Sequence, residues 1–387
     1  MSDSLQRKNV VVLGSTGSIG ESSLKVARDI PELMNVIGLA ANRSVESLAS
    51  QIDEFDIKQA CLFEPTGLDD LSKRVGSDVT LHTGEEGLVE LATLPEADLV
   101  LIAIVGVAGL RPALAAIEAG KDIAVASKEI LVMAGEAVMT AAREKGVRVL
   151  PVDSEHNAIF QCLEDRSSAD VSRLILTASG GPFREFPADQ LANVTKAQAL
   201  KHPTWEMGQK ITIDSATLFN KGLEMIEARW LFDIEMARVD VIIHPQSIVH
   251  SMVEFIDSSV LAQLSTTDMC FPIQYAVTWP ERVPNTLPPL DFAELARLDF
   301  EAPRWDDFPA LTLAKEAGTA GGTLPAIMNA ANEVAVSAFL SEKIAFPKIW
   351  ETVAKTMEKH DTLSHPSLEE IINADVEART IATELIA

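Results

Sequence analysis

The sequence predicts an α/β protein in which a parallel sheet covered by helices is followed by a mixed α/β region and a helical region. Short apolar runs alternate with segments of helical length in the first third of the chain. Apolar strands and one clear helix share the middle, and the last part contains only helical patterns. At 387 residues the chain is too long for one ordinary core, so several domains are expected.

The first region, residues 1–150, contains five short apolar runs that predict strands of a parallel sheet. The runs are Val10–Leu13, Val36–Leu39, Leu99–Val105, Ile123–Ala126 and Val147–Val152. The longest uncharged apolar stretch, Leu99 to Leu110, is shorter than the ~20 residues that a helix needs to cross a bilayer. We therefore expect a strand buried on both faces there, and no membrane partner.

The middle region, residues 151–280, combines the apolar segments "RLILTAS" and "VDVIIHPQSIVHSMVEF" with a helix around Glu224. A proline-rich stretch, residues 281–303, predicts a linker. The last region, residues 304–387, contains the helical patterns "NAANEVAVSAFL" and "KIWETVAKTMEKH". Ser367, followed three residues later by Glu370, predicts a capping box at the start of the final helix.

The charge balance restricts the possible partners. The chain has 32 basic and 57 acidic residues, a formal net charge of -25. Nucleic-acid phosphates require clustered Lys and Arg, so we expect no nucleic-acid partner. The same field repels small anions, so a phosphorylated ligand would need local basic groups and backbone N–H groups. Each basic residue inside a motif is therefore a stronger indication of an anion-binding site than it would be in a less acidic chain.

The cysteines predict a reducing compartment. Cys61, Cys162 and Cys270 are odd in number, far apart and without metal-ligand spacing, which suits reduced thiols. The opening segment "MSDSLQRK" is not followed by the apolar stretch of a secretion signal. We therefore expect a cytoplasmic protein without a zinc site.

Three glycines mark the turn after the first predicted strand, in "NVVVLGSTGSIGESSLKVA". Gly14, Gly17 and Gly20 stand at a strand-to-helix junction, where backbone N–H groups can approach a pyrophosphate at the helix N-terminus. The spacing differs by one residue from the commonest dinucleotide fingerprint. A tight turn in any α/β protein is an equal alternative, so the glycines alone are a weak signal.

The end of the second predicted strand indicates which dinucleotide would bind. NAD-specific sites place an Asp or Glu there to bond the ribose 2′-hydroxyl, but this chain reads "LAANRS". Arg43, flanked by Asn42 and Ser44, suits a 2′-phosphate, so we predict NADPH rather than NAD. The alternative is that Arg43 is a solvated loop charge.

A pair of carboxylates follows the last run of the first region, in "VLPVDSEHNAIFQ". If the strand continues through Asp153 and Glu155, the two side chains lie on the same side, at positions i and i+2. Two oxygen ligands converging at a strand end suit Mg²⁺ or Mn²⁺. On this motif alone, solvated carboxylates or separate ion pairs are an equal alternative.

The segment "IDSATLFNKGLEMIEARWLF" predicts a helix with one buried stripe. Asn220 and Glu224 stand at i and i+4 with Lys221 beside them, which gathers an amide, an ammonium and a carboxylate on one turn. A Lys-Glu pair at this spacing is usually a surface ion pair of small value. Ser215 upstream makes an inward-facing polar cluster the more plausible interpretation.

Two further segments carry residues suited to an anionic substrate. In "LILTASGGPF", Ser179 and the two glycines after it could expose backbone N–H groups as an anion nest, or form only a turn. In "KHPTWEMGQK", His202 directly precedes a short stretch that is bounded by Pro203 and Gly208 and contains Trp205. That stretch could be a lid over a substrate, although a Trp is more often part of a core.

Eight segments together establish a resemblance that none establishes alone. They are "GSTGSIG", "AIVGVAGL", "ASKE", "PVDSEHNAIFQ", "SGGPF", "HPTWEMGQKITIDSATLFNKGLEMIEARWLF", "HPQSIVHSM" and "NAANE". In order and approximate spacing they resemble the 1-deoxy-D-xylulose 5-phosphate reductoisomerase family over nearly the whole chain. The segments "PVDSEHN" and "DSATLFNKGLEMIEA" are highly specific, whereas the glycine turn is not.

The resemblance implies a homodimeric enzyme of non-mevalonate isoprenoid biosynthesis. Such an enzyme isomerises 1-deoxy-D-xylulose 5-phosphate and reduces the product to 2-C-methyl-D-erythritol 4-phosphate, using NADPH and a divalent metal. The implied architecture is a Rossmann-like NADPH-binding domain, a central α/β catalytic and dimerisation domain with a flexible lid, and a C-terminal helical domain. The metal would be Mg²⁺ or Mn²⁺, with Co²⁺ a further option.

Matching motifs carry the family's functional residues onto this chain. The implied metal ligands are Asp153, Glu155 and Glu224. The implied substrate contacts are Lys128, Ser154, Glu155, Ser179, His202, Trp205, Ser215, Asn220, Lys221 and Glu224. The implied cofactor contacts are Thr16, Gly17, Ser18, Ile19, Asn42, Arg43, Ser44, Ser127, Glu129 and Gly208. The residues expected to act in catalysis are Lys128, Asp153, Glu155, His202 and Glu224.

Two positions do not follow simply from the pattern. The family usually reads Ala-Asn-Lys-Glu where this chain has Ser127 before Lys128, and a serine keeps hydrogen bonding but loses reach. In an ideal strand Ser154 points away from Asp153 and Glu155, so the chain must bend there if all three serve one site.

The residue types fit this chemistry. A metal chelated by a ketone oxygen and a neighbouring hydroxyl acts as a Lewis acid, and NADPH supplies hydride to the resulting aldehyde. Lys128 would stabilise developing negative charge, and phosphate contacts would orient the substrate and help to close the lid. The rearrangement itself rests on the resemblance alone.

Two alternatives stay open at this point. The chain could be a metal-dependent NADPH reductase of another phosphorylated keto-sugar, which a panel of sugar phosphates would separate from the first hypothesis. It could also be a catalytically silent nucleotide sensor that kept the fold. The complete set of three carboxylates and the lid segment disfavour the sensor.

Overall fold

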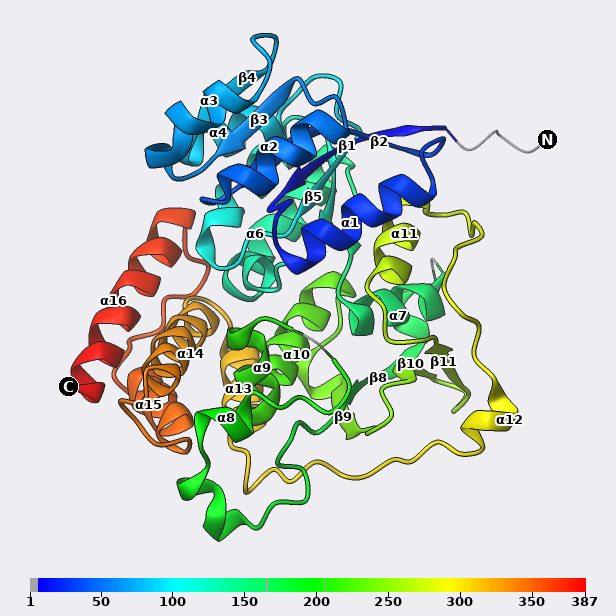
Figure 1. Cartoon of the computed structure of the whole chain (residues 1–387). Helices are drawn as coiled ribbons and strands as arrows, with labels where there is room; N and C mark the ends of the chain where they lie inside the picture. Colours follow the sequence, from blue (N-terminus) through cyan, green and yellow to red (C-terminus); the bar gives the residue numbers. More distant parts are fainter. Residues whose placement is uncertain (1–5, 165, 206) are drawn as a thin grey trace. The chain divides into compact units, whose positions relative to one another are not determined.

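The computed structural model describes residues 6–164, 166–205 and 207–387, which form two compact units. Residues 1–130, 137–157 and 268–288 belong to the first unit, and residues 131–136, 158–267 and 289–387 belong to the second. The first five residues of the opening segment "MSDSLQRK" and Glu206 of the lid segment lie outside the described residues. Figure 1 labels the elements of both units.

The first unit is built on a parallel seven-stranded sheet with the strand order β4-β3-β2-β1-β5-β6-β7. The strands are β1 (Lys8–Leu13), β2 (Met34–Ala41), β3 (Gln59–Leu62), β4 (Thr80–Thr83), β5 (Leu99–Ile102), β6 (Asp122–Val125) and β7 (Val149–Pro151). The order reverses at β1, which pairs with both β2 and β5. Ligands of such sheets bind at the carboxyl ends of the strands beside this reversal.

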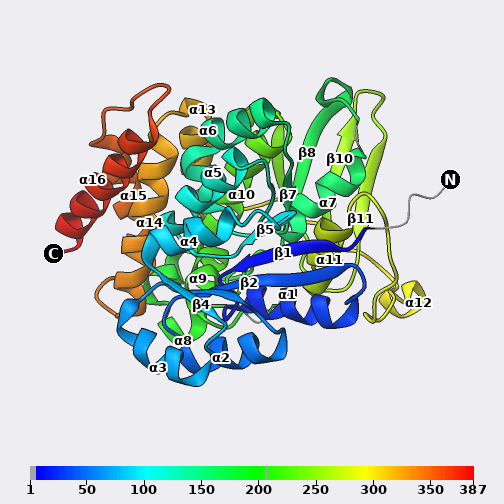
Figure 2. The same cartoon turned by 90° about the horizontal axis from the view of Figure 1, so that it is seen from above.

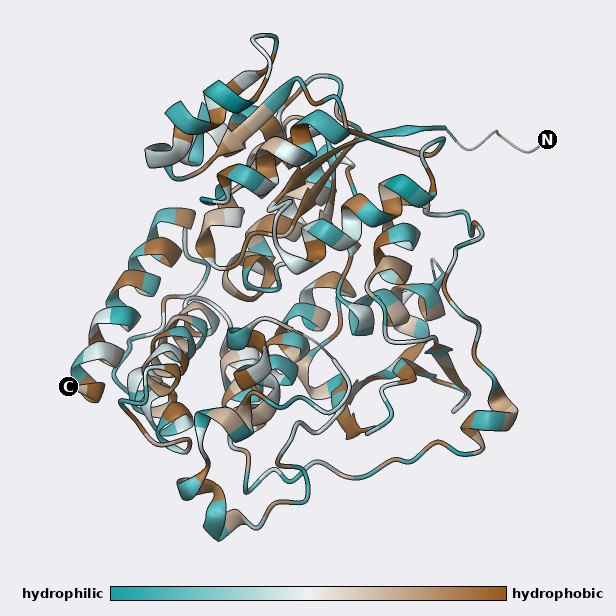
Figure 3. Ribbon diagram, in the orientation of Figure 1, coloured by the Kyte–Doolittle hydropathy of each residue, from teal (hydrophilic) through white to brown (hydrophobic). Residues whose placement is uncertain are grey.

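Helices cover both faces of this sheet, which confirms the predicted α/β class. The helices of the N-terminal part are α1 (Ser18–Asp29), α2 (Val45–Glu54), α3 (Leu68–Arg74), α4 (Gly84–Ala92), α5 (Leu110–Glu118) and α6 (Glu129–Lys145). Figure 2 shows α1, α2 and α3 on one side of the strands and α4 and α5 on the other. The central strands are apolar over most of their length, as their brown colour in Figure 3 shows. Val10–Leu13 of β1 and all of β5 are buried. Helix α11 (Cys270–Thr278) packs against α1 in this unit.

Five of the seven strands were predicted, with small differences at their ends. The run expected over Leu99–Val105 forms a strand only to Ile102, after which the chain turns into the 3-10 helix Val107–Gly109. Strands β3 and β4 were missed: β3 has only the three-residue apolar run Ala60–Leu62, and β4 is a half-exposed edge strand without an apolar run.

The second unit contains a mixed four-stranded sheet with the strand order β11-β10-β8-β9. Its strands are β8 (Val171–Ala178), β9 (Val239–Ile243), β10 (Val249–Phe255) and β11 (Val260–Leu264). Strand β10 pairs antiparallel with β8 and β11, whereas β8 and β9 are parallel. The outer edge of β11 pairs with none of the described strands, so β11 is an edge strand of this sheet.

The remaining helices pack against each other and this sheet around one apolar core. They are α8 (Lys196–Ala199), α9 (Gln209–Thr217), α10 (Phe219–Leu231), α13 (Ala310–Ala320), α14 (Leu324–Leu340), α15 (Lys348–Glu358) and α16 (Leu368–Ile386). The short helix α12 (Phe292–Leu295) has no buried residue and lies outside this core. Helix α7 (Ser154–Leu163) begins in the first unit and ends in the second. Phe346 is fully buried in this core, with its ring against those of Phe183, Phe339 and Trp350. The predicted capping box of α16 is present, with Ser367 and Glu370 each accepting a backbone N–H of the other.

The glycine turn between β1 and α1 is tightly packed at two of its three glycines. Gly14 has a φ of +96°, and a Cβ there would lie 2.5 Å from the carbonyl oxygen of Ala103. A Cβ on Gly20 would lie 2.3 Å from the carbonyl oxygen of Gly14. At Gly17 the nearest atom would be 3.5 Å away, which is an ordinary contact. Two of the glycines are therefore required by the fold, and Gly17 is not.

We expect Gly20→Ala to lower the free energy of unfolding by about 1–3 kcal/mol, because the new methyl group overlaps backbone atoms that cannot move independently. Gly17→Ala is the matched control and should leave stability within about 0.5 kcal/mol of the parent protein. Chemical denaturation measures both values. Equal stability of the two variants would contradict the steric assignment.

Candidate active site

The turn after β1 places the predicted pyrophosphate contacts at the N-terminus of α1. Thr16 and Gly17 precede the helix, and Ser18 and Ile19 are its first residues. The first N–H groups of a helix have no partner within it, so they are available to an anion.

A buried hydrogen-bond network that the sequence analysis missed stabilises this turn. The hydroxyl of Ser15 donates to Oε1 of Gln51 (2.7 Å), and Nε2 of Gln51 donates to the carbonyl of Ser15 (3.2 Å) and to Glu21 (2.8 Å).

The Asn42–Ser44 loop lies at the same edge of the sheet as this turn. It follows β2, and the N–H groups of Gly14 and Ser15 both donate to the carbonyl of Ala40 near the end of that strand. All three residues of the loop are exposed. The structure therefore brings together the two sequence features that predict NADPH.

The segment after β6 holds Ser127, Lys128 and Glu129, all of them buried. Ser127 donates its hydroxyl to the carbonyl of Ile104, the second residue after β5. The serine that replaces the usual asparagine therefore ties two loops of the first unit together. Glu129 is the first residue of α6.

The Asp153–Glu155 segment does not continue the strand, so the strand prediction is wrong here. Strand β7 ends at Pro151, and helix α7 begins at Ser154. The carbonyl of Asp153 accepts the N–H of Asn157, which makes Asp153 the residue that caps the helix. The chain therefore bends where the sequence analysis required it to bend. The bend lets the hydroxyl of Ser154 donate to Oε2 of Glu155.

Lys128 and Asp153 form a largely buried ion pair in the first unit. Nζ of Lys128 lies 2.7 Å from Oδ2 of Asp153, and only 9% and 16% of the two side chains are exposed. Burial alone would favour the protonated acid, but the charge of Lys128 and the contact with His156 outweigh it. The pKa of Asp153 therefore lies well below its usual range, and the carboxylate is ionised at neutral pH.

In the second unit, His202 joins two serines that come from different elements. Its Nε2 lies 3.0 Å from Oγ of Ser179, just after β8, and 3.1 Å from Oγ of Ser215 in α9. Its Nδ1 accepts the backbone N–H groups of Thr204 (3.3 Å) and Trp205 (3.0 Å). These donors assign the proton of the neutral ring to Nε2, so the ring presents an N–H to the two hydroxyls.

The turn after Ser179 is not an open anion nest. The N–H of Gly181 donates to Oγ of Ser179 (3.2 Å), so this amide is already used. Gly181 also lies directly against the backbone of Ser215, where a Cβ would be 2.8 Å from the carbonyl oxygen. The turn therefore holds Ser179 and Ser215 at a fixed separation and supplies a hydroxyl to the cluster.

The described residues of the predicted lid segment, 203–205, 207 and 208, lie between α8 and α9 without regular structure. Trp205 is half-buried, with its ring centre 6.4 Å from that of His250. Gly208 caps α9 and is exposed. The backbone of Trp205 is thus bonded to His202, and its ring contacts a second histidine.

Asn220, Lys221 and Glu224 gather on the first turns of α10 as predicted. Nδ2 of Asn220 donates to Oε1 of Glu224 (2.5 Å), and Nζ of Lys221 pairs with Oε2. Glu224 is fully buried and Lys221 nearly so. The alternative of a surface ion pair is therefore excluded, because both side chains are buried. The two donors hold the carboxylate of Glu224 in one position.

The predicted residues thus fall into two groups, one in each unit. The first unit holds the glycine turn, the Asn42–Ser44 loop, Lys128 and the Asp153–Glu155 segment. The second unit holds Ser179, His202, Trp205, Gly208, Ser215 and the α10 cluster. Within the described residues, no helix is long and apolar enough to span a membrane.

Three family models match consecutive parts of the chain. A 1-deoxy-D-xylulose 5-phosphate reductoisomerase model matches residues 10–135, and two models of the C-terminal domains of the same enzyme match residues 149–232 and 264–381.

Similar proteins match over almost the full length. The chain is 50% identical to the 1-deoxy-D-xylulose 5-phosphate reductoisomerase of Pelotomaculum thermopropionicum and 51% identical to that of Geobacter metallireducens, covering 98% of this chain in both and 98% and 99% of the relatives. The Zymomonas mobilis reductoisomerase solved with NADPH superposes with a TM-score of 0.92 at 46% identity, covering 98% of this chain and 99% of that one. A reductoisomerase solved with NADPH, fosmidomycin and magnesium gives 0.91 at 42% identity, covering 98% of both chains. This chain therefore belongs to the 1-deoxy-D-xylulose 5-phosphate reductoisomerase family.

Proposed function

We propose that this protein isomerises 1-deoxy-D-xylulose 5-phosphate and reduces the product to 2-C-methyl-D-erythritol 4-phosphate, with NADPH and a divalent metal. The observation that carries the proposal is that this member of the reductoisomerase family has Lys128 paired with Asp153 and a buried cluster around Glu224. A silent sensor of nucleotides would not need these costly buried charges.

The metal site is proposed to consist of Asp153 and Glu155 from the first unit and Glu224 from the second. Asp153 is held ionised, and Glu224 is buried with its oxygens fixed by Asn220 and Lys221, so both suit a hard cation such as Mg²⁺ or Mn²⁺. When bound, the metal supplies Lewis-acid polarisation of the substrate's ketone and neighbouring hydroxyl.

The phosphate end of the substrate is proposed to lie against Ser179, His202, Ser215, Asn220 and Lys221. Hydroxyls, an imidazole N–H, an amide and an ammonium are all donors that a phosphate accepts. Their gathering counters locally the repulsion from a chain of net charge -25. The backbone bond from Trp205 to His202 connects the lid segment directly to this group.

At the reacting end, Lys128 is proposed to balance the negative charge that develops on the substrate oxygens. It is nearly buried, so its charge acts through a medium of low dielectric constant. Asp153 orients its ammonium group, and Ser154 orients the carboxylate of Glu155. Closure of the lid segment would exclude water from these groups.

NADPH is proposed to bind along the carboxyl edge of the parallel sheet. Residues 16–19 would hold the pyrophosphate, and Arg43 with Asn42 and Ser44 would hold the 2′-phosphate. Ser127, Glu129 and Gly208 are proposed as further cofactor contacts. The first region, residues 1–150, would be the cofactor domain, residues 151–280 the catalytic and dimerisation domain, residues 281–303 a linker and residues 304–387 a helical domain.

We also infer a homodimer formed through the edge strand β11. Val260 and Leu261 of this strand are 47% and 42% exposed, and Ile256 before it is 69% exposed. An unpaired edge with apolar side chains is a template for pairing with another strand, and a second copy can supply one by two-fold symmetry.

The cytoplasm is the proposed compartment. All three cysteines are buried, and burial raises the pKa of Cys61 to about 12, which keeps that thiol protonated and inert. Cell fractionation with immunodetection tests this location.

The proposed reaction predicts oxidation of NADPH that requires both 1-deoxy-D-xylulose 5-phosphate and Mg²⁺ or Mn²⁺. Loss of absorbance at the nicotinamide band measures the rate, and NADH should be much less effective because Arg43 would lack its phosphate partner. The product should be the branched polyol phosphate. Turnover of other phosphorylated keto-sugars, with none of this substrate, would favour the alternative reductase.

The proposed ligand set predicts that Glu224→Gln and Asp153→Asn each lower metal-dependent turnover about 100-fold or more. Affinity for NADPH, measured by fluorescence titration, should stay within twofold. Glu235→Gln, at an exposed carboxylate of the second unit, is the matched control and should retain the parent rate. An unchanged rate in Glu224→Gln would remove that residue from the site.

The proposed interface predicts that replacing Val260 and Leu261 by lysine converts the protein from a dimer to a monomer, because charges oppose pairing of the edge strands. Light scattering coupled to gel filtration measures the mass. Val376→Lys, at a 57% exposed position of α16, is the control and should remain dimeric. A monomeric parent protein would contradict the proposal.

A further inference from the structure

The "NAANE" segment of α14 contains buried polar side chains that the proposed site does not use. Asn329 and Asn332 are both fully buried in this largely apolar helix. Polar groups at such positions are retained only where they make hydrogen bonds. The contacts of these two asparagines lead to different parts of the second unit.

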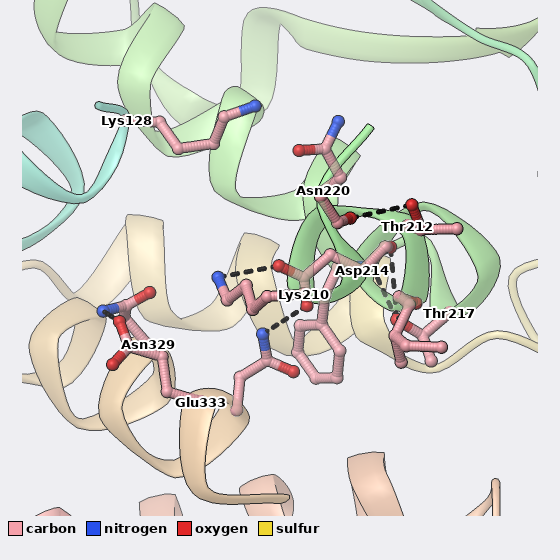
Figure 4. Close-up of polar contacts among 12 residues, drawn as sticks. Lys128, Lys210, Thr212, Asp214, Thr217, Asn220, Asn329 and Glu333 are labelled. Atoms are coloured by element: carbon pink, nitrogen blue, oxygen red, sulfur yellow. Dashed lines mark hydrogen bonds and ion pairs between the residues drawn. The ribbon is translucent and has the colours of Figure 1, made fainter. Parts of the chain in front are cut away.

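Asn332 reaches α9. Its Nδ2 donates to Oδ1 of Asp214 (2.8 Å), and Nζ of Lys210 lies 2.7 Å from Oδ2 of the same carboxylate. Figure 4 shows the dashed contact between Asp214 and Lys210. Only 2% of the Asp214 side chain is exposed, so the lysine and the amide hold a carboxylate that is removed from water.

The hydrogen bond to Asp214 explains why Asn332 is polar. Oδ1 of Asn332 is buried without a hydrogen-bond partner, so the amide is only partly satisfied. An apolar side chain of the same size would cost less at this position if packing were its only role. The amide is therefore present for its bond to Asp214, which fixes α9 against α14.

Asp214 directly precedes Ser215, whose hydroxyl lies 3.1 Å from Nε2 of His202. Helix α9 has only nine residues, and it follows the lid segment directly. A small rotation of so short a helix displaces Ser215 from the position that a phosphate group requires. The hydrogen bond from Asn332 to Asp214 fixes the orientation of α9 against α14. It thereby fixes the position of Ser215 on the same helix.

Asn329 lies one turn earlier on α14 and has a different partner. Its Nδ2 donates to Oε1 of Glu333 (3.0 Å), and Oε2 of Glu333 pairs with Arg379 of α16 (2.7 Å). This contact connects α14 to the last helix and not to α9. Asn329 is therefore a matched control of the same residue type, burial and helix.

We propose that Asn332 and Asp214 are positioning residues, through which the C-terminal helical region sets the phosphate-binding geometry of α9. The proposal rests on the proposed function, in which Ser215 and His202 contact the substrate phosphate. It assigns to the "NAANE" segment a role in substrate affinity that acts through Asp214.

The test compares Asn332→Leu with Asn329→Leu in the full-length protein. Asn332→Leu should raise KM for 1-deoxy-D-xylulose 5-phosphate about tenfold or more, the equivalent of one buried hydrogen bond to a charged group. The constant for inhibition by inorganic phosphate should rise in parallel, while KM for NADPH and kcat stay within about twofold. Asn329→Leu should lower the midpoint of thermal unfolding about as much as Asn332→Leu does. It should leave both KM values, kcat and the phosphate inhibition constant near those of the parent protein.

Asp214→Asn gives a second route if Asn332→Leu does not fold. It keeps the shape of the side chain but weakens both of its contacts, and it should raise the same KM without changing the KM for NADPH. Combining it with Asn332→Leu should add little to the single effects, because both changes remove one interaction. Equal effects of Asn332→Leu and Asn329→Leu, or full additivity, would overturn the proposal. A parent enzyme that does not turn over this substrate would instead contradict the proposed function.

Discussion

The neutralisation of buried carboxylates by lysine is the interaction on which the site depends. The described residues include Lys128 with Asp153, Lys221 with Glu224 and Lys210 with Asp214. A chain of net charge -25 has acidic groups in excess, but an acid removed from water is stable only beside a fixed cation or several donors. Two of these acids are proposed metal ligands, and the third holds the helix that carries Ser215. The need to pair buried carboxylates with lysine therefore applies both to the proposed metal ligands and to the helix that supports the site.

Much of the fold follows from local patterns. The buried stripe of α10 and the capping box at Ser367 are determined by residues three and four positions apart, and the structure contains both. The strand expected through Asp153 was wrong because alternation over three residues cannot distinguish a strand from the first turn of a helix. An Asp followed by Ser and Glu is also a helix start, and here that preference decides the conformation.

The site is divided in the same way between local and distant determinants. The α10 cluster was predictable because its donors lie within one helical turn of Glu224. The hydrogen bond between Ser15 and Gln51 spans 36 residues, and the bond between Asn332 and Asp214 spans 118 residues. Neither contact can be predicted from a local sequence pattern. Such contacts depend on how helices pack, and a single sequence does not contain that information. The supporting residues of a site are therefore harder to predict than the groups that perform the chemistry.

His202 shows how such support controls chemistry. Its Nδ1 is committed to the backbone N–H groups of residues 204 and 205, which leaves the proton on Nε2. The ring can therefore donate to the hydroxyls of Ser179 and Ser215, and in the proposed complex it would donate to a phosphate oxygen instead. Because the same backbone carries Trp205, movement of the lid segment cannot be separated from the orientation of this donor. In the proposed complex, substrate binding and the position of the lid segment would therefore be coupled through this imidazole ring.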